Sequence, residues 1–245
     1  MNSRPYRERA ARRSEPDGRP AEPSLPSDAD PRLLDPSVRA ELRSLTADTA
    51  ETVARHLVAA GIVVDDDAQQ ALRHARFARS IAARVGSVRE AVGVAAYHAQ
   101  EWAEALAELR AARRITGDSR WLAVTADCER ALGRPDRALK ALLDPELSTL
   151  DPETQIEVLI VVAGARRDLG QPDAALQVLD RAKPDRSRPR AGSSRLWYAY
   201  ADVLTDLGRV EEAKAWFTAV AALDEDETDA AERAGLESPV DDSEA

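Results

Sequence analysis

Four segments of the chain repeat the same order of small, turn and large apolar residues. They begin at residues 98, 131, 168 and 206, so successive copies are 33, 37 and 38 residues apart. In each copy a turn residue is followed five positions later by alanine and nine positions later by a large apolar residue. Internal periods of about 20 to 50 residues are typical of solenoid proteins. This repeat therefore constrains the fold more than any other feature of the sequence.

Each repeated position has a structural interpretation. The turn residues are Gln100, Gly133, Gly170 and Gly208, and glycine readily takes the left-handed conformation that ends many helices. A small residue seven positions before the turn and the alanine after it let two antiparallel helices approach closely. One helical hairpin buries only part of its apolar surface, so the copies are expected to stack. The small residues are Gly93, Ala126, Ala163 and Ala201, the alanines are Ala105, Ala138, Ala175 and Ala213, and the large apolar residues are Leu109, Leu142, Leu179 and Phe217.

The spacing of apolar residues indicates helices throughout the middle of the chain. It predicts about ten helices between residues 36 and 224, joined by short turns, and no strand. Aromatic residues make up only 4% of the chain, which favours close-packed helices over a sheet. The predicted fold class is therefore all-α.

Two helix starts carry recognisable signals. Asp35 as N-cap and Pro36 at the first helical position predict one long helix that ends at Gly61. Ser87 and Glu90 have the spacing of a capping box and are predicted to begin a later helix.

The composition changes at both ends of the repeat region. The N-terminus holds six prolines among charged residues up to residue 31, which predicts disorder. From residue 224 onward, ten acidic residues face a single arginine, so this tail carries −9 of the formal net charge of −10. The sequence thus predicts a disordered basic and proline-rich arm over 1–34, an N-terminal helical hairpin that is a degenerate or capping repeat over 35–85, four repeats over about 86–118, 119–151, 152–190 and 191–224, and an acidic tail over 225–245.

The fourth copy resembles the tetratricopeptide repeat. Its segments "WYAYADVL" and "GRVEEAKAWF" place Trp197, Ala201, Ala213 and Phe217 at the tryptophan, glycine, alanine and phenylalanine positions of that repeat. The resemblance extends over about residues 86–224, although the tyrosine and the closing proline of the repeat are not matched. It implies a right-handed α-solenoid of antiparallel helix pairs. It also implies a non-catalytic scaffold or adaptor that binds a peptide or helix of a protein partner on its concave face.

In the resembled family, particular positions of each repeat's first helix line the concave face. The version that grips a C-terminal carboxylate has Lys and Asn where this chain has Glu90, Val94 and Val124, so binding of chaperone-type acidic C-termini is not expected. The concave-face candidates that the resemblance implies are Tyr97 and His98 from the first repeat, Arg120, Asp127 and Arg130 from the second, Arg167 and Asp168 from the third, and Arg195, Tyr198 and Asp202 from the fourth.

The sequence shows no spacing of reactive groups that would indicate an enzyme. His56, His74 and His98 are not spaced as in a zinc-binding helix, and the single cysteine, Cys128, excludes a cysteine cage. Glycine-rich phosphate loops and the G-x-S-x-G motif are absent. We therefore expect no catalytic residue, no metal site, no cofactor and no small-molecule substrate.

The apolar runs are too short for a membrane helix, which needs about 20 residues. The N-terminus also lacks the apolar core of a secretory signal. These features predict a cytoplasmic protein with no membrane partner. The basic residues are almost all arginine, a bias typical of a GC-rich bacterial genome.

Two alternatives to a protein-binding scaffold stay open. One is an RNA- or ribosome-associated factor that uses the loop 183–195 and an arginine-rich arm as phosphate contacts. A protein partner is favoured over nucleic acid because the arm has no lysines. The other alternative, a metal- or nucleotide-dependent enzyme, requires a bound cofactor. The arginines of the arm are Arg4, Arg7, Arg9, Arg12 and Arg13.

Overall fold

The structure of the chain is a computed structural model that describes residues 20–223 and 228–236. Within these ranges the backbone forms twelve α-helices and three short 3-10 helices, without a strand. The fold is all-α, as the sequence predicts. The chain divides into two compact units, residues 1–117 and 118–245, and this division was not predicted.

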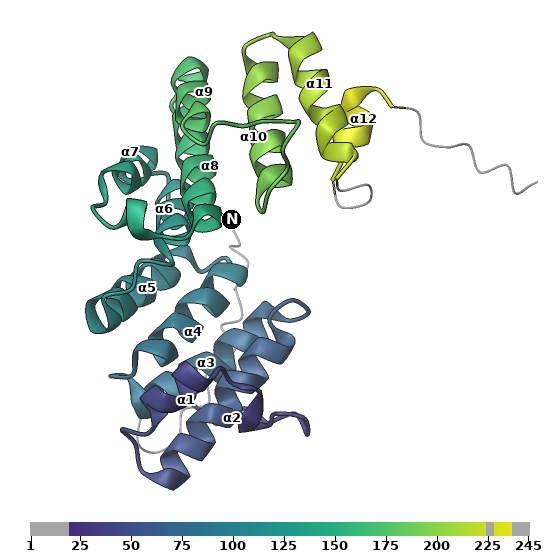
Figure 1. The fold of residues 1–245 in the computed structure, drawn as a ribbon. Helices are drawn as coiled ribbons and strands as arrows, with labels where there is room; N and C mark the ends of the chain where they lie inside the picture. The colour runs from purple at the N-terminus through teal and green to yellow at the C-terminus, as the bar shows by residue number, and fades with distance from the viewer. Residues whose placement is uncertain (1–19, 224–227, 237–245) are drawn as a thin grey trace, which may run out of the picture. The chain divides into compact units, whose positions relative to one another are not determined.

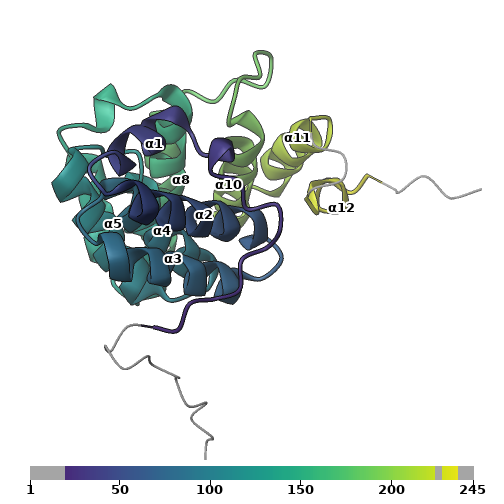
Figure 2. The ribbon, with the colours of Figure 1, turned by 90° about the horizontal axis from the view of Figure 1, so that it is seen from below.

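The first unit is built from successive helical hairpins. Its elements are η1 (Pro31–Leu33), α1 (Pro36–Leu42), α2 (Ala47–Val63), α3 (Ala68–Ala82), α4 (Gly86–His98) and α5 (Trp102–Thr116). Helices α2 to α5 lie side by side in chain order, and each packs on the next (Figures 1 and 2). Each hairpin therefore buries its apolar face against its neighbour.

The prediction of one long helix from Asp35 to Gly61 is wrong, because the structure has two helices there. Asp35 does cap α1, since its Oδ1 accepts a hydrogen bond from Ser37 N at 2.7 Å. However, α1 ends at Leu42, and α2 begins at Ala47 and runs past Gly61. The intervening residues include neither glycine nor proline, so the local pattern does not show the break.

The predicted capping box of Ser87 and Glu90 is also wrong. The N-cap of α4 is Val85, and the Ser87 hydroxyl is buried without a hydrogen-bond partner among the described residues. Instead Glu41 of α1 caps α4, because its Oε2 accepts a hydrogen bond from Ser87 N at 2.9 Å. A carboxylate at this end of a helix is also favoured by the helix dipole. This contact holds α1 across the start of α4, so α1 cannot continue straight into α2.

Residues 20–34 pack on the first unit and are not part of a disordered arm. Ala29 is buried against Val58 and Ala59 of α2. The arm prediction is therefore wrong for this segment. The remaining part of the arm, residues 1–19, includes its arginines and lies outside the described residues.

The second unit continues the pattern of paired helices. Its elements are α6 (Leu122–Ala131), α7 (Pro135–Ala138), η2 (Leu139–Leu143), η3 (Leu147–Thr149), α8 (Pro152–Asp168), α9 (Pro172–Asp180), α10 (Ser193–Asp206), α11 (Val210–Ala221) and α12 (Ala230–Ala234). The pairs α8 with α9 and α10 with α11 form two hairpins (Figure 1). They are the third and fourth copies of the repeat.

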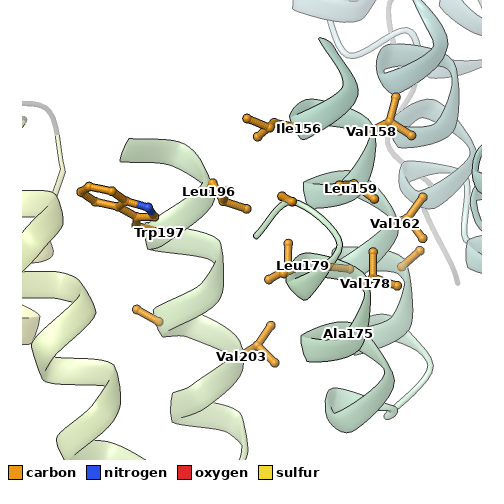
Figure 3. Packing of buried hydrophobic residues seen from close by; sticks show 14 of the residues in the cluster. Ile156, Val158, Leu159, Val162, Ala175, Val178, Leu179, Leu196, Trp197 and Val203 are labelled. Carbon is orange, nitrogen blue, oxygen red and sulfur yellow. The ribbon is translucent and has the colours of Figure 1, made fainter. Parts of the chain in front are cut away.

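The core of the second unit runs through these two hairpins. In Figure 3, Leu196 and Val203 point from α10 toward α8 and α9, where Val162 and Leu179 are fully buried. Trp197 points to the other side of α10 and is 2% exposed. Full burial of one such leucine or valine contributes roughly 1.5 to 3 kcal/mol to stability. One helix, α10, thus supplies apolar side chains to two interfaces.

The four turn residues all take the left-handed conformation. The φ angles are 59° at Gln100, 71° at Gly133, 69° at Gly170 and 72° at Gly208. Gly170 N donates to Arg167 O at 2.8 Å and Gln171 N donates to Arg166 O at 2.9 Å, and the other three turns have the same pair of bonds. This is the Schellman arrangement of a helix C-terminus. It satisfies the last carbonyls of each first helix and turns the chain back along it.

The second copy departs from the regular hairpin. Helix α7 is short, and the tighter turns of η2 replace the rest of the expected second helix. Ala138 is still buried at 1% exposure, but Leu142 is only half-buried. Pro145 explains the early end, because the residue before a proline favours an extended conformation and Asp144 has φ −66° and ψ 125°.

Helix α12 lies in the region predicted to be an acidic tail. Ala230 is fully buried, and the Arg233 guanidinium lies over the Phe217 ring with its carbon 4.0 Å from the ring centre. The tail prediction is therefore wrong for residues 228–236, which pack on α10 and α11. An alanine-rich turn with one arginine has enough apolar contact to order this segment.

Candidate functional site

A groove of about 840 Å³ lies between α8 and α10 in the second unit. Its walls are the first helices of the third and fourth hairpins. The small residues Ala163, Gly164 and Ala199 line it, with Ile160 and Val203 beside them. The loop before α10 and the segment after α11 also border it.

Half of the predicted concave-face residues border this groove. They are Arg130, Arg167, Arg195, Tyr198 and Asp202. Each of them forms a hydrogen bond or ion pair with another side chain, so the groove is lined by fixed polar groups. The other predicted residues lie beside these or elsewhere.

Arg130 of α6 connects the second copy to the third. Its Nε is 2.8 Å from Asp168 Oδ2 and its Nη2 is 3.2 Å from Asp168 Oδ1, while Nη1 is 3.0 Å from Asp127 Oδ1. Partial burial lowers the pKa of Arg130, but the hydrogen bond to Asp168 and the charges of both carboxylates outweigh burial and raise it. Asp127 and Asp168 therefore hold this arginine in place at the rim of the groove.

Gly164 of α8 is what allows Arg130 to lie there. A Cβ atom at Gly164 would come within 2.6 Å of the Arg130 guanidinium carbon. The guanidinium thus occupies space that any other residue at position 164 would fill. This contact explains a glycine in the middle of a helix, where glycine is otherwise unfavourable.

Arg167 of α8 makes the equivalent connection from the third copy to the fourth. Its Nε is 2.6 Å from Asp206 Oδ2, and its Nη1 is 3.0 Å from Asp202 Oδ2. Burial lowers the pKa of Arg167, and the two carboxylates more than compensate, so the pKa is raised. Arg130 and Arg167 each lie three residues before a turn glycine, and Asp168 and Asp206 each lie two residues before one.

The fourth copy adds further fixed groups to the groove. Arg195 Nη2 is 2.8 Å from Glu153 Oε1 on the opposite wall. The Tyr198 hydroxyl donates to Asp229 Oδ1 at 2.5 Å and accepts from Arg233 Nη1 at 3.0 Å. Burial, together with the bond to Asp229, raises the pKa of Tyr198. The segment that carries α12 thereby holds one side of the groove.

Three predicted residues lie away from the groove. Tyr97 and His98 belong to the first unit, where the Tyr97 ring packs edge-on against Trp102 with centres 5.3 Å apart and His98 is exposed. Arg120 precedes α6 and pairs with its neighbour Asp118 through Nε and Oδ2 at 2.6 Å. The structure does not bring these three residues into the groove.

The basic loop of the RNA alternative lies between α9 and α10. Lys183, Arg188 and Arg190 border a second cavity of about 350 Å³ beside the groove. Arg190 borders both cavities, as does Pro189. The arginines of the N-terminal arm lie outside the described residues.

Sequence reasoning missed Glu153, which lines the groove, and Arg233, which bonds to its Tyr198 and Asp202. Neither residue is at a position that the family resemblance implies, whereas Arg190 belongs to the loop 183–195 of the RNA alternative. The pairs Arg130–Asp168 and Arg167–Asp206 could have been predicted from the sequence. In both pairs the arginine lies three residues before a turn glycine and the aspartate two residues before the next one.

A buried histidine pair in the first unit was also missed. His56 Nδ1 lies 2.9 Å from His74 Nδ1, and both side chains are fully buried. His56 Nε2 lies 3.3 Å from Glu22 Oε1, so Nε2 carries the proton and Nδ1 accepts from His74. His74 Nε2 is then left as a buried acceptor without a partner among the described residues. Burial, aided by the nearby charges of His56 and Arg73, lowers the pKa of His74 to about 4.

Neither a metal-binding cluster nor a membrane-spanning helix is found among the described residues. No group of three histidine, cysteine or acidic side chains there could hold a metal ion. None of the helices in residues 20–223 and 228–236 is long and apolar enough to cross a membrane.

Comparison with known proteins gives one family. Residues 194–227 match the family model of the tetratricopeptide repeat, and they span α10 and α11. No curated protein matches the chain. The matched hairpin shares its Schellman turn with three other copies in the chain. The hairpin of α10 and α11 is therefore a repeat of the tetratricopeptide type.

Proposed function

We propose that this protein is a non-catalytic scaffold or adaptor that binds a peptide or helix of a protein partner in the groove between α8 and α10. Tetratricopeptide repeats in general mediate protein–protein interaction. The observation that carries the proposal is that first helices of successive hairpins form both walls of the groove, and one of them lies in the matched repeat. On this proposal the protein acts in the cytoplasm and needs no cofactor.

The groove offers a partner two kinds of contact. Small and apolar side chains along the groove that are only partly buried, such as Ile160 and Ala199, suit apolar side chains of a bound segment. The rim carries arginines and carboxylates that already pair with each other, for example Arg195 with Glu153. Because these side chains are held in place, binding loses little of their conformational entropy.

The test fills the groove without removing a charge pair. Ala199 lies in the groove and is only partly buried, so Ala199→Arg places a long side chain where the partner would lie. Ala107→Arg is the matched control, since Ala107 is exposed on α5 in the first unit. Each tagged full-length variant is used to purify partners from the native cell, and bound proteins are compared by quantitative mass spectrometry.

We expect Ala199→Arg to lose at least one partner that wild type and Ala107→Arg both retain. Circular dichroism and thermal melting of both variants establish that the loss is not a failure to fold. Identical partner sets for all three proteins would reject the groove as the binding site. A photoreactive residue at position 198 gives an independent readout, because it should crosslink to the lost partner.

A further inference from the structure

The segment between α9 and α10 holds an excess of positive charge, which the single carboxylate of Asp185 offsets only in part. Its five basic residues are Arg181, Lys183, Arg186, Arg188 and Arg190. In the part of the chain that the structure describes, none of these forms an ion pair, whereas the arginines of the groove are paired. Asp180 accepts instead from the Tyr200 hydroxyl at 2.9 Å, and Asp185 accepts from Ser187 Oγ at 2.7 Å.

Three of these basic side chains border one cavity. Lys183, Arg188 and Arg190 line the cavity of about 350 Å³ together with one carboxylate, that of Asp185, and with Leu196 and Trp197 of α10. Arg190 also lines the groove between α8 and α10. A protein segment that lies in the groove can therefore reach the cavity without leaving the surface.

Lys183 has an unusual backbone conformation. Its φ is 51°, and Gln100 is the one other non-glycine residue with positive φ in the described ranges. A side chain makes this conformation less favourable than it is for glycine. Lys183 N donates to Asp180 O at 2.9 Å, so this residue ends the turn after α9, and its side chain borders the cavity.

The excess of three cations over the one carboxylate of Asp185 at the cavity favours a multiply charged anion. A phosphomonoester carries about −1.5 to −2 charges and three acceptor oxygens, enough for three cations to share, whereas a carboxylate carries one charge and two oxygens. Single-stranded RNA would need exposed aromatic faces for base stacking. Trp197 is 2% exposed, and the Arg186 guanidinium lies 4.8 Å from the centre of the Trp216 ring. The surroundings therefore favour a phosphate carried by protein over one carried by RNA.

We infer that Lys183, Arg188 and Arg190 bind a phosphorylated serine or threonine of the protein segment that occupies the groove. This inference rests on the proposed function and specifies the chemistry of the partner. Phosphorylation of that partner would then control its binding.

The test uses the full chain and a defined probe, the peptide acetyl-Ala-Ala-pSer-Ala-Ala-amide. Binding is followed by two-dimensional NMR of the backbone and of the arginine side chains. The parallel probes are the same peptide with Ser or Glu in place of pSer, inorganic phosphate, and an oligouridine. We expect saturable shifts at residues 183–197 with the pSer peptide, and at least tenfold weaker binding of the Ser and Glu peptides.

The variant Lys183→Ala with Arg188→Ala removes two charges whose side chains form no hydrogen bond with the described residues. We expect this double variant to bind the pSer peptide at least tenfold more weakly than wild type does. Arg137→Ala with Lys140→Ala removes the same charges from exposed positions on α7 and η2, and should change affinity less than twofold. Lys183→Gly is a second variant, because glycine adopts a positive φ without strain. It should raise the melting temperature of the protein and still weaken its binding of the pSer peptide.

Three results would overturn the inference. One is equal affinity of wild type and the Lys183, Arg188 double variant for the pSer peptide. Another is no gain of the pSer peptide over inorganic phosphate, which would indicate an anion site unrelated to a partner. The third is tighter binding of oligouridine than of peptide at the same residues. None of these results affects the proposed function, which is tested separately by Ala199→Arg.

Discussion

The Arg130 guanidinium on α6 and the Asp168 carboxylate on α8 face each other through two contacts, Nε to Oδ2 at 2.8 Å and Nη2 to Oδ1 at 3.2 Å. Arg167 and Asp206 repeat this arrangement between α8 and α10, at 2.6 and 3.3 Å. These two inter-repeat ion pairs join the first helices of successive repeats. They therefore help to set the spacing of the helices that form the groove.

The Arg130–Asp168 pair should contribute a small but measurable amount to stability. Because Asp168 is 40% exposed, solvent screening limits the coupling energy between Arg130→Ala and Asp168→Ala to about 0.5 kcal/mol. A double-mutant cycle by urea unfolding measures it, and added salt should reduce it. The exposed pair of Arg209, just before α11, and Glu212, in its first turn, serves as control and should show a smaller coupling. Equal coupling for the two pairs would contradict the role of Arg130 between repeats.

Gly93 should be intolerant of alanine, although it lies within a helix. A Cβ atom there would be 2.5 Å from Leu109 Cγ and 3.3 Å from Leu109 N, so α4 and α5 would have to separate. We expect Gly93→Ala to lower the free energy of unfolding by about 1 to 3 kcal/mol. Gly61→Ala in α2 is the control, because a Cβ atom there meets nothing within 4 Å. It should raise stability by up to about 1 kcal/mol, and a loss at both sites would show that packing is not the cause.

The turn after α4 can be improved, whereas the turn after α8 cannot. Gln100 has φ 59° where the other three copies have glycine, so Gln100→Gly should raise the free energy of unfolding by about 0.5 to 1 kcal/mol. Gly170 has φ 69°, and Gly170→Ala should lower the free energy of unfolding by about 1 kcal/mol. Thermal melting of the two variants gives the signs directly. A stabilising Gly170→Ala would show that the left-handed turn is not required.

Acid should destabilise the first unit through its buried histidine pair. The pKa of His74 is about 4 in the folded chain against an ordinary value of 6.5, so the unfolded chain binds more protons in between. The contribution of the pair is thus complete above pH 6.5 and is lost as the pH falls toward 4, by up to about 1.4 kcal/mol per pH unit for one proton. Urea unfolding at a series of pH values measures this slope.

A variant that cannot titrate isolates the effect of the pair. His74→Gln keeps a hydrogen-bond donor near His56 Nδ1 but binds no proton, so its slope between pH 6.5 and 4 should be smaller than that of wild type. His98→Gln changes an exposed histidine and should keep the wild-type slope. A His74→Gln slope equal to that of wild type would assign the acid sensitivity to other groups.

The helical class and the turns were predictable because they depend on local chemistry. Glycine at three of the four turn positions and alanine five residues after each turn predict helical hairpins. Gln100, at the fourth turn position, takes the same left-handed conformation as the glycines. The break between α1 and α2 was not predictable, since Glu41 makes its contact with Ser87 across the unit. No local residue choice encodes that hydrogen bond.

The candidate groove was predictable in part. The resemblance to the tetratricopeptide repeat predicted Arg130, Arg167 and Tyr198, because the first helix of each copy presents the same positions to the groove. It did not find Arg190, which comes from a loop whose path depends on the packing of α9 and α10. The histidine pair was hidden for a related reason, since His56 and His74 meet only when α2 and α3 fold against each other.

The inter-repeat ion pairs make neighbouring repeats interchangeable at their junctions. Arg130 and Arg167 hold equivalent places, so excision of residues 131–167 would put Arg130 opposite Asp202 and Asp206, the partners that Arg167 has now. Duplication of the same stretch would place Ala131 where Arg130 now meets Asp168, so one of the pairs would be lost. A gene for such a protein can therefore lose a whole unit by recombination and still encode a matching ion pair, which gives a route for shortening the array.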